Sequence, residues 1–513
     1  MTKEKSPFSL NIPEIKSLLK INYEVADLSS AYAVLHWDQE TYMPKGAIHG
    51  RAEQLATLAG TVHKIATSKK VGRLIESLSK KEEAGDLNLC DRALLREWRR
   101  SYEREVKVPK RLVEAMSRAT SVGTAVWQRA RQESKFSIFK DVLQKIFDLK
   151  IKEAEHVGFA ENRYNLFLDD HEPGLTTEFL DKIFAELRDI VIDISRKAHS
   201  ANYHIDQDIL RKKLDEKELW DFTIAVLTAM GFDFDRGRQD KVAGHPFTTG
   251  FHHDDVRITT RFREQFFTSG IFTAIHEGGH AIHHQGGDAA LSRTAIHQMH
   301  SLGLAESQSR FWENYIGRSA AFWRHWYPRL MQSFPGAGFE AAHEDDFVRA
   351  VNKIEPNLIR VDSDEVTYNL HIIIRYEIER DLFANRLKIG NLPEAWNAKI
   401  KDYLGLDVPS DAKGVLQDVH WSHGSFGYFP TYSLGNLYAA QINRKIRSAF
   451  PDFDERIAKG EMIFVRDWLR DNIHKHGGVY GVDELIKKVT GEPLNPKHFR
   501  DYLQDKFGKI YHF

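Results

Sequence analysis

Helical periodicity runs through most of this chain and is rarely interrupted, since only 15 prolines occur among 513 residues. Segment 176–199 spaces its apolar residues three or four positions apart. Segment 364–388 has the same spacing, and it sets Arg375 four residues before Glu379, as in a helical ion pair. The chain is therefore expected to be mainly α-helical. The apolar positions of the first segment are Phe179, Ile183, Phe184, Leu187, Ile190 and Ile194.

We expect one large helical domain over residues 1–513, in which the N-terminal helices, about 1–90, form a flap. No low-complexity linker or internal repeat divides the chain, and the polar segments near 80–88 and 334–345 are typical of loops. Hydrophobic residues make up 42% of the chain and charged residues 28%, which suits a globular protein with a sizeable core.

Charge and cysteine content exclude several classes of function. The net charge is −1, so no overall field favours nucleic acid or an anionic membrane. The single cysteine, Cys90, permits neither a disulfide within the chain nor a metal site built from thiolates. No run of 18 apolar residues and no signal-peptide segment occurs, so we expect a cytoplasmic protein without membrane spans.

One segment, 254–262, departs from the helical pattern because its residues alternate with a period of two. The apolar and β-branched positions are Val256, Ile258, Thr260 and Phe262. This alternation predicts a strand with one buried and one solvated face. If an edge of this strand is exposed, it can pair with an extended peptide backbone and so accept peptides of many sequences.

The segment that follows, TAIHEGGHAIHHQGG (273–287), contains the pattern H-E-x-x-H at His276, Glu277 and His280. On a helix, residues four apart face the same way, so both imidazoles can bind one ion, with Glu277 beside them as a base. His283 and His284 do not share this spacing, and we expect them to be packing or solvated residues. The pattern also arises by chance, so it needs support from elsewhere.

The flanking residues favour a helix, with Ser269 as an N-cap and Gly286 at the end. A catalytic zinc ion takes three protein ligands and keeps one open position. The next helical segment, 301–317, offers Glu306, and an antiparallel return would bring its carboxylate to the histidines. Glu313, two turns further along, is the lower-ranked alternative.

Several long blocks of this sequence, in order, resemble the carboxypeptidase Taq family of metallocarboxypeptidases over nearly the full chain. The N-terminal half contributes LHWDQETYMP (35–44), RAEQLATLAG (51–60), HPFTTGF (245–251), DVRIT (255–259) and HEGGH (276–280). The C-terminal half contributes ESQ (306–308), IRVDSDEVTYNLHI (359–372), GVLQDVHW (414–421) and GYFPTYSLGNLYAAQ (427–441).

The resemblance implies a mainly helical fold with a deep groove and a small β element, similar to neurolysin and angiotensin-converting enzyme. It implies one divalent metal ion, Zn²⁺ or Co²⁺ in its place, and a homodimer that removes single residues from peptide C-termini. Carried over by position, the metal ligands are His276, His280 and Glu306, and Glu277 is the general base.

The sequence departs from the family at three places. The usual H-E-S-Q begins with Ala305 here, Ser363 replaces the usual alanine of the I-R-x-x-A-D block, and His283 stands where a tyrosine is usual. A residue at 305 of a helix points about 100° away from 306, so metal binding need not fail, but we expect a contact to the substrate, or one that supports a metal ligand, to be missing.

Peptide hydrolysis also needs a donor to the tetrahedral oxyanion. The glycine- and aromatic-rich segment 417–432 offers His420, His423, Tyr428 and Tyr432. The resemblance favours His420 and Tyr428, while the alternative is that these rings only pack a loop.

A carboxypeptidase must also bind a terminal carboxylate, for which the planar fork of arginine is suited. Arg360, in a family block, is the candidate, and Arg257 is the second choice. The structural alternative pairs Arg360 with Asp362 or Asp364, and Arg257 with Asp255.

Two further assignments stay open. Asp364 or Glu365 orients a ligand histidine or is ordinary helix-surface charge. The tryptophans are expected in the core or at a dimer contact; they are Trp312, Trp323 and Trp326.

Three functions compete. The leading one is a metallocarboxypeptidase of broad specificity. The second is an oligopeptidase that cleaves internal bonds or dipeptides with the same metal site. The third, of another class, is a peptide-binding protein with a vestigial site, to which Ala305 lends some support.

Overall fold

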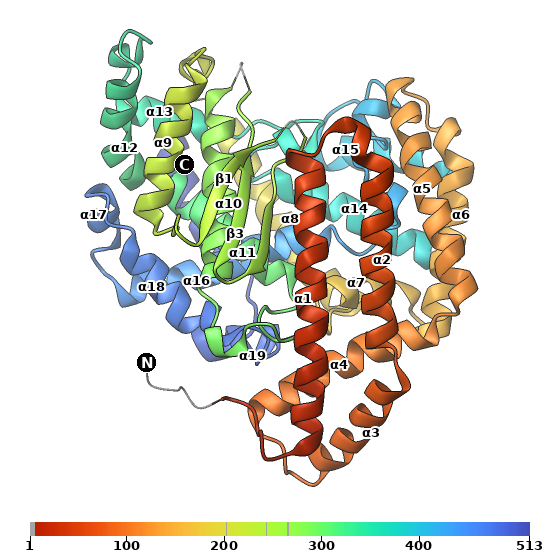
Figure 1. The fold of residues 1–513 in the computed structure, drawn as a ribbon. Coiled ribbons are helices and arrows are strands. Elements are labelled where there is room, and N and C mark those ends of the chain that lie inside the picture. Colours follow the sequence, from red (N-terminus) through yellow and green to blue (C-terminus); the bar gives the residue numbers. More distant parts are fainter. Residues whose placement is uncertain (1–5, 202, 243, 264–265) are drawn as a thin grey trace.

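The computed structural model describes residues 6–201, 203–242, 244–263 and 266–513. As predicted, helices dominate, and a small sheet lies against them (Figure 1). In the described part of the chain, no helix is long and apolar enough to cross a bilayer. The first ten α-helices are α1 (Pro13–Thr41), α2 (Ile48–Ala66), α3 (Lys69–Glu83), α4 (Leu89–Lys107), α5 (Lys110–Gln132), α6 (Ser137–Val157), α7 (Arg163–His171), α8 (Thr177–Ser200), α9 (Glu216–Met230) and α10 (Phe267–Gln285).

The remaining α-helices complete the helical body around the sheet and α10. They are α11 (Leu302–Arg310), α12 (Ala320–Ser333), α13 (Glu344–Val351), α14 (Tyr368–Phe383), α15 (Leu392–Leu404), α16 (Pro430–Ala449), α17 (Phe453–Ala458), α18 (Ile463–Asn472), α19 (Val482–Thr490) and α20 (Lys497–Tyr511).

The three strands are β1 (Gly237–Lys241), β2 (Thr248–His252) and β3 (Asp255–Thr260), in the order β1-β3-β2. β3 pairs parallel with β1 and antiparallel with β2. The predicted strand is confirmed, but its predicted exposed edge is wrong, because β3 is central and β2 is an edge. The solvated face is also only partial: Val256 and Ile258 are buried as expected, but Thr259 is buried too.

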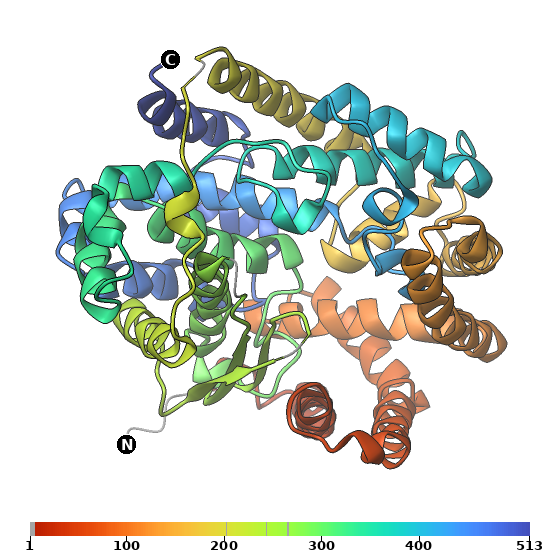
Figure 2. The same cartoon turned by 90° about the horizontal axis from the view of Figure 1, so that it is seen from above.

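Helix α10, which carries H-E-x-x-H, lies at the centre of the molecule (Figure 2). It packs against β2 and β3 on one side and against α9, α11 and the π-helical segment η4 (Phe311–Gly317) on the others. The helix ends at Gly286 as predicted, but Ser269 does not cap it, because the helix begins two residues earlier, at Phe267. Burial on all sides explains why α10 needs no polar cap side chain to form.

Two other predicted helices are present with shorter or shifted bounds. α8 begins after Thr176, whose hydroxyl accepts from the backbone N–H of Phe179, and the Phe179 ring itself is exposed. α14 starts at Tyr368 rather than near 364. The predicted helical ion pair on α14 is wrong, because Arg375 and Glu379 are both fully buried and bind other partners. The tryptophans Trp312, Trp323 and Trp326 are buried in the main core, as expected.

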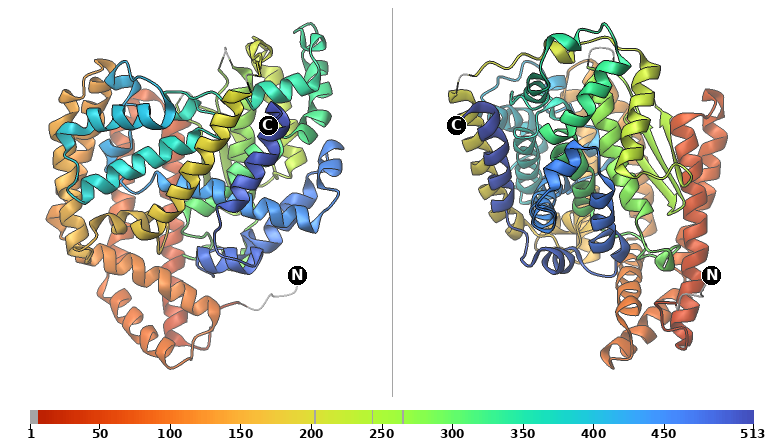
Figure 3. Two further views of the ribbon diagram at one scale, coloured as in Figure 1. Left: turned by 180° about the vertical axis from the view of Figure 1, so that it is seen from behind. Right: turned by 90° about the vertical axis from the view of Figure 1, so that its left-hand side faces the viewer.

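The N-terminal helices form a smaller cluster with its own apolar core. α1 and α2 run as an antiparallel pair beside the sheet, with α3 and α4 at one end (Figures 1 and 3). Ile15, Leu18, Val71 and Leu94 are buried in this second core, which is separate from the main one. α2 itself has no buried residue. A cavity of about 480 Å³ lies between α1, α2 and the helices behind them, lined by Tyr32, Val62, Arg104 and Leu166 among others.

Candidate metal centre and active site

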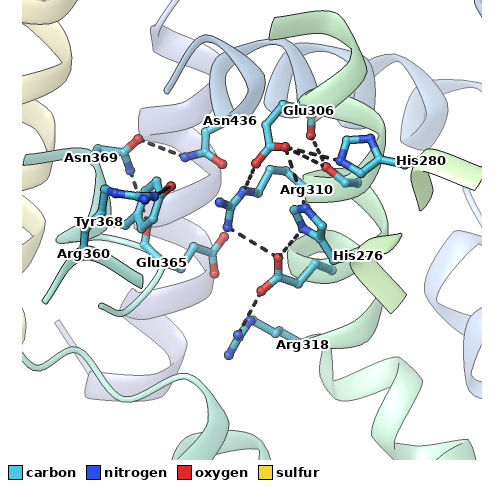
Figure 4. A network of polar contacts seen from close by, with 12 residues as sticks. His276, His280, Glu306, Arg310, Arg318, Arg360, Glu365, Tyr368, Asn369 and Asn436 are labelled. Carbon is cyan, nitrogen blue, oxygen red and sulfur yellow. Dashed lines mark hydrogen bonds and ion pairs between the residues drawn. The ribbon is translucent and has the colours of Figure 1, made fainter. Parts of the chain in front are cut away.

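The two histidines of α10 and the carboxylate of α11 converge at one point (Figure 4). Glu306 Oε2 lies 3.7 Å from His276 Nε2 and 3.5 Å from His280 Nε2. One ligand atom from each residue lies within 4.8 Å of the other two. Ligands held at about 2.1 Å around a tetrahedral zinc ion are separated by roughly 3.4 Å, so this donor set fits such an ion.

The two glycines of the motif allow neighbouring helices to come close. A β-carbon at Gly279 would lie 2.8 Å from the carbonyl oxygen of Gln308 and from Ser309 Cα, in the backbone of α11. At Gly278 it would instead lie 2.4 Å from Leu227 Cδ2, on α9. The backbone of α11 therefore approaches α10 at Gly279, which brings Glu306 to the histidines.

Glu306 is buried, and its two oxygens have separate roles. Oε1 accepts from Arg310 Nε at 2.7 Å, so that Oε2 is turned to the histidines. Burial opposes ionisation, but Arg310 and His276 outweigh it and hold the pKa of Glu306 well below its usual range. The third ligand is therefore a carboxylate anion at neutral pH.

Glu313 lies behind the ligands and is not one of them. Its Oε2 accepts from His276 Nδ1 at 3.0 Å, and its Oε1 accepts from Arg318 Nη2 at 3.0 Å. A carboxylate on the outer nitrogen fixes the imidazole so that Nε2 keeps its lone pair for a metal. This position agrees with the lower rank given to Glu313 as a third metal ligand. The residue lies in the π-helical segment, and such segments often carry functional residues.

The two residues expected in this orienting position are elsewhere. Asp364 accepts from the backbone N–H groups of Val366 and Thr367 at the start of α14. Glu365 pairs with Lys506 at 2.6 Å. The prediction that either of them orients a ligand histidine is wrong, because the carboxylate that contacts His276 Nδ1 is that of Glu313.

Glu277 is buried beside the ligands, where β2 meets α10. Its Oε2 accepts from the hydroxyl of Thr248 at 2.6 Å, and the same hydroxyl lies 3.0 Å from the Glu277 carbonyl oxygen. One carboxylate oxygen is thus held by the sheet, and no described residue donates a hydrogen bond to the other.

The segment that carries His420 and Tyr428 is held by a buried carboxylate. Glu379 on α14 accepts from Trp421 Nε1 at 2.7 Å and from the backbone N–H of Gly427 at 2.8 Å. Tyr164 donates to the same carboxylate. The two ends of the segment are therefore fixed relative to each other.

His420 and Tyr428 lie together, with ring centroids 5.3 Å apart. Burial lowers the pKa of His420 to about 4, so the ring is neutral at pH 7. Burial and the charge of Glu306 raise the pKa of Tyr428, so its hydroxyl keeps its proton. His171 on α7 packs edge-on against Tyr428, with centroids 5.1 Å apart. Both predicted donors therefore have the protonation states that hydrogen-bond donation requires.

Arg360 and Arg257 already have acidic partners. Arg360 is buried and binds Asp418 Oδ1 through Nη2 at 2.8 Å, while its Nη1 donates to the Tyr368 hydroxyl at 2.8 Å. Its partner is thus neither Asp362 nor Asp364. Arg257 binds Asp255, the expected local partner, at 2.9 Å and stacks over Trp37.

The predictions from the sequence missed three residues of the site: Thr248, Arg310 and Glu379. Thr248 lies in the quoted block HPFTTGF, and Arg310 lies one helical turn after Glu306, so both had a signal in the sequence. Glu379 had none, because its partners lie 42 and 48 residues away along the chain. His283 and His284 are packing residues as expected; His283 packs against His474.

Comparison with known proteins agrees with this geometry. A family model described as Carboxypeptidase Taq (M32) metallopeptidase matches residues 17–507. Carboxypeptidase 1 of Bacillus subtilis (strain 168) is 38% identical over 498 residues, which cover 97% of this chain and 98% of that protein. Thermostable carboxypeptidase 1 of Thermus thermophilus is 39% identical over 508 residues, with the same coverage.

Solved structures match the fold equally well. The M32 carboxypeptidase from Deinococcus radiodurans R1 superposes with a TM-score of 0.94 at 34% identity, over 98% of this chain and 100% of that one. Trypanosoma cruzi metallocarboxypeptidase 1 superposes with a TM-score of 0.92 at 34% identity, over 96% and 99%. The similarity therefore covers nearly the whole chain in sequence and in fold.

Proposed function

The chain belongs to the carboxypeptidase Taq (M32) family of metallopeptidases, and from this premise we propose that it removes single residues from peptide C-termini. The chain is a metallocarboxypeptidase. We propose the identity of its metal ion, the roles of its site residues and its substrate specificity. The proposal rests mainly on the convergence of His276, His280 and Glu306, with Glu277 beside them. His276, His280 and Glu306 would hold one divalent ion, which is Zn²⁺ or, as a substitute for it, Co²⁺.

A divalent ion at this position supplies a Lewis acid that polarises the scissile carbonyl and lowers the pKa of water. Glu277 takes the proton from the attacking water on its free oxygen and passes it to the leaving amine. The Thr248 hydroxyl holds the other oxygen, so the carboxylate keeps one orientation through both transfers. His420 and Tyr428 donate hydrogen bonds to the oxyanion as it forms.

For the terminal carboxylate we propose Arg360, with Arg257 as the second choice. One Nη1 hydrogen of Arg360 now goes to a phenol, the Tyr368 hydroxyl, which is a weaker acceptor than a carboxylate. An incoming terminal carboxylate can therefore displace Tyr368 while Asp418 keeps the guanidinium in place. Arg257 has both of its bonds on Asp255, which favours a structural role.

Backbone pairing along the sheet edge supports broad specificity. β2 is an edge strand, and its first residue, Thr248, touches Glu277. A substrate paired with this edge would be held by its main chain, without regard to its side chains. Slow cleavage of substrates N-methylated on the pairing amides would support this arrangement, and unchanged rates would contradict it.

The remaining predictions concern assembly and environment. We propose a homodimer in the cytoplasm that acts on peptides, with the N-terminal helices as a flap beside the site. The apolar core of those helices is separate from the main one, which supports the flap, and Leu291, Ile296 and Val479 from outside the helices also pack in it. Light scattering of the purified protein tests the dimer.

The deciding experiment compares a peptide with a free C-terminus and its amidated form, using wild type and Glu277→Gln. A carboxypeptidase releases one residue at a time from the free peptide only, and the variant loses this activity while it keeps its metal. Equal cleavage of the amidated peptide would favour the oligopeptidase. A protein that binds peptide but no divalent ion would favour the vestigial site.

A further inference from the structure

A second group of histidines lies at the turn between β2 and β3, outside the residues proposed for catalysis. His252, His253 and Asp254 each offer one ligand atom, and these atoms lie within 4.8 Å of one another. Asp254 Oδ2 is 3.1 Å from His253 Nε2 and 3.6 Å from His252 Nδ1. These separations bracket the roughly 3.4 Å between ligands of a tetrahedral zinc ion.

One hydroxyl contacts the outer nitrogens of both rings. Ser292 Oγ lies 2.8 Å from His252 Nε2 and 3.3 Å from His253 Nδ1. If both outer nitrogens donate to Ser292, the inner nitrogens carry lone pairs, as metal binding requires. The backbone N–H of Asp254 donates to His252 Nδ1 at 3.2 Å, so the lone pair is on that nitrogen, and an ion would take the place of this hydrogen bond. Ser292 is thus placed as an orienting residue for two imidazole ligands.

The third ligand is oriented in the same way. Arg236 Nε donates to Asp254 Oδ1 at 2.6 Å, which turns Oδ2 to the histidines. Arg236 Nη2 also donates to the carbonyl oxygens of His253 and Gln285, at 2.7 and 3.0 Å. The turn is therefore fixed to the end of α10, and its ligand atoms need little rearrangement to bind an ion.

A third imidazole lies next to this group. The His297 ring is 5.9 Å from the His253 ring, between centroids. Its Nδ1 is buried and has no hydrogen-bond partner among the described residues.

We propose that the β2–β3 turn binds a second divalent transition-metal ion through His252 Nδ1, His253 Nε2 and Asp254 Oδ2. Water takes the remaining position. Two imidazoles and one carboxylate suit zinc, nickel or copper rather than magnesium or calcium. The ion would hold the turn in the conformation in which both rings contact Ser292. This site is independent of the proposed function, because it shares no residue with the catalytic centre.

Equilibrium dialysis against a series of free Zn²⁺ concentrations, with metal content measured per chain, tests the site. Wild type is expected to bind two equivalents, the second more weakly because His252 and Asp254 are partly exposed. His252→Ala with His253→Ala is expected to bind one, and so is His276→Ala with His280→Ala. The variant with all four changes is expected to bind none.

The four stoichiometries separate failure of this proposal from failure of the proposed function. In the order wild type, the double variant at 252 and 253, the double variant at 276 and 280, and the variant with all four changes, bound equivalents of one, one, none and none would overturn the second site and leave the catalytic one. In the same order, bound equivalents of one, none, one and none would overturn the catalytic site alone. Asp254→Asn, which preserves the shape of the side chain, is expected to lower the affinity for the second zinc ion at least tenfold.

A control variant removes two exposed histidines elsewhere, by His49→Ala and His199→Ala. It is expected to keep two equivalents. If it loses one, or if the second equivalent survives His252→Ala with His253→Ala, the binding is surface binding and the proposal is wrong. Circular dichroism of each variant confirms that it is folded.

Discussion

Gly279→Ala should separate the third metal ligand from the two histidines. The added β-carbon would lie 2.8 Å from two backbone atoms of α11, at Gln308 and Ser309. Ordinary contact needs about 3.5 Å, so the helices must move apart by roughly 0.7 Å, because backbone cannot rotate away. A metal site tolerates errors of only about 0.2 Å in its ligand distances. We therefore expect zinc affinity to fall by a factor of about 10 to 100, as it does when a ligand's support is lost.

Gly278→Ala is the matched control. It adds the same methyl group to the same helix, and both changes gain up to about 1 kcal/mol of helix propensity. Its contact is Leu227 Cδ2 at 2.4 Å, which is the end of a flexible side chain on α9, away from Glu306. Overpacking should lower the free energy of unfolding by about 1–3 kcal/mol in either variant. Only Gly279→Ala should lose zinc affinity.

The assay is competition for Zn²⁺ with a chromogenic chelator, alongside thermal unfolding of the metal-free proteins. The unfolding data separate lost stability from lost affinity. Wild-type affinity in Gly279→Ala, or an equal loss in Gly278→Ala, would refute the argument that Gly279 sets the position of Glu306.

Four further predictions follow from the site. Glu277→Gln should lower kcat by at least about 10²-fold with the metal retained, since a general base contributes about 10²–10⁴; unchanged turnover would remove Glu277 from the mechanism. Thr248→Val should lower kcat about tenfold or more through loss of a charge-assisted hydrogen bond, whereas Thr249→Val, on the opposite face of β2, should not. Arg360→Lys should raise KM for a peptide with a free C-terminus far more than it changes the affinity for its amidated form, and an equal change would point to a structural role. Burial raises the pKa of Glu379 from 4.5 to about 7, so its contribution to stability is full below about pH 4.5 and is lost as pH rises through 7. Between pH 4 and 8, the free energy of unfolding of Glu379→Gln should therefore rise relative to that of the wild type by up to roughly 3 kcal/mol, as measured by denaturant unfolding. If the two free energies change with pH in parallel, the pKa of Glu379 is not raised.

A local pattern in the sequence was enough to find two of the three residues of the candidate metal site, and the third, Glu306, came from the next helical segment and the family resemblance. H-E-x-x-H places two imidazoles on one helical face whatever surrounds the helix, because the spacing follows from 3.6 residues per turn. The alternation in 254–262 likewise predicted a strand. Neither pattern identifies neighbours, so the sequence did not show that β3 is central or that β2 touches Glu277.

Longer-range partners came only from the structure. Arg375 and Glu379 have the spacing of a helical ion pair, yet α14 is buried and each side chain binds the 418–428 segment instead. Asp418, not a neighbour in sequence, is the partner of Arg360.

Residue spacing within one helix is set by backbone geometry, and so the chain alone determined that His276 and His280 lie on one face of α10 with Glu277 beside them. Which buried charge meets which partner depends on how helices far apart in sequence pack together. Only the tertiary structure therefore decided that Glu313 contacts His276, that Glu379 holds the loop of His420 and Tyr428, and that Ser292 contacts both histidines of the β2–β3 turn.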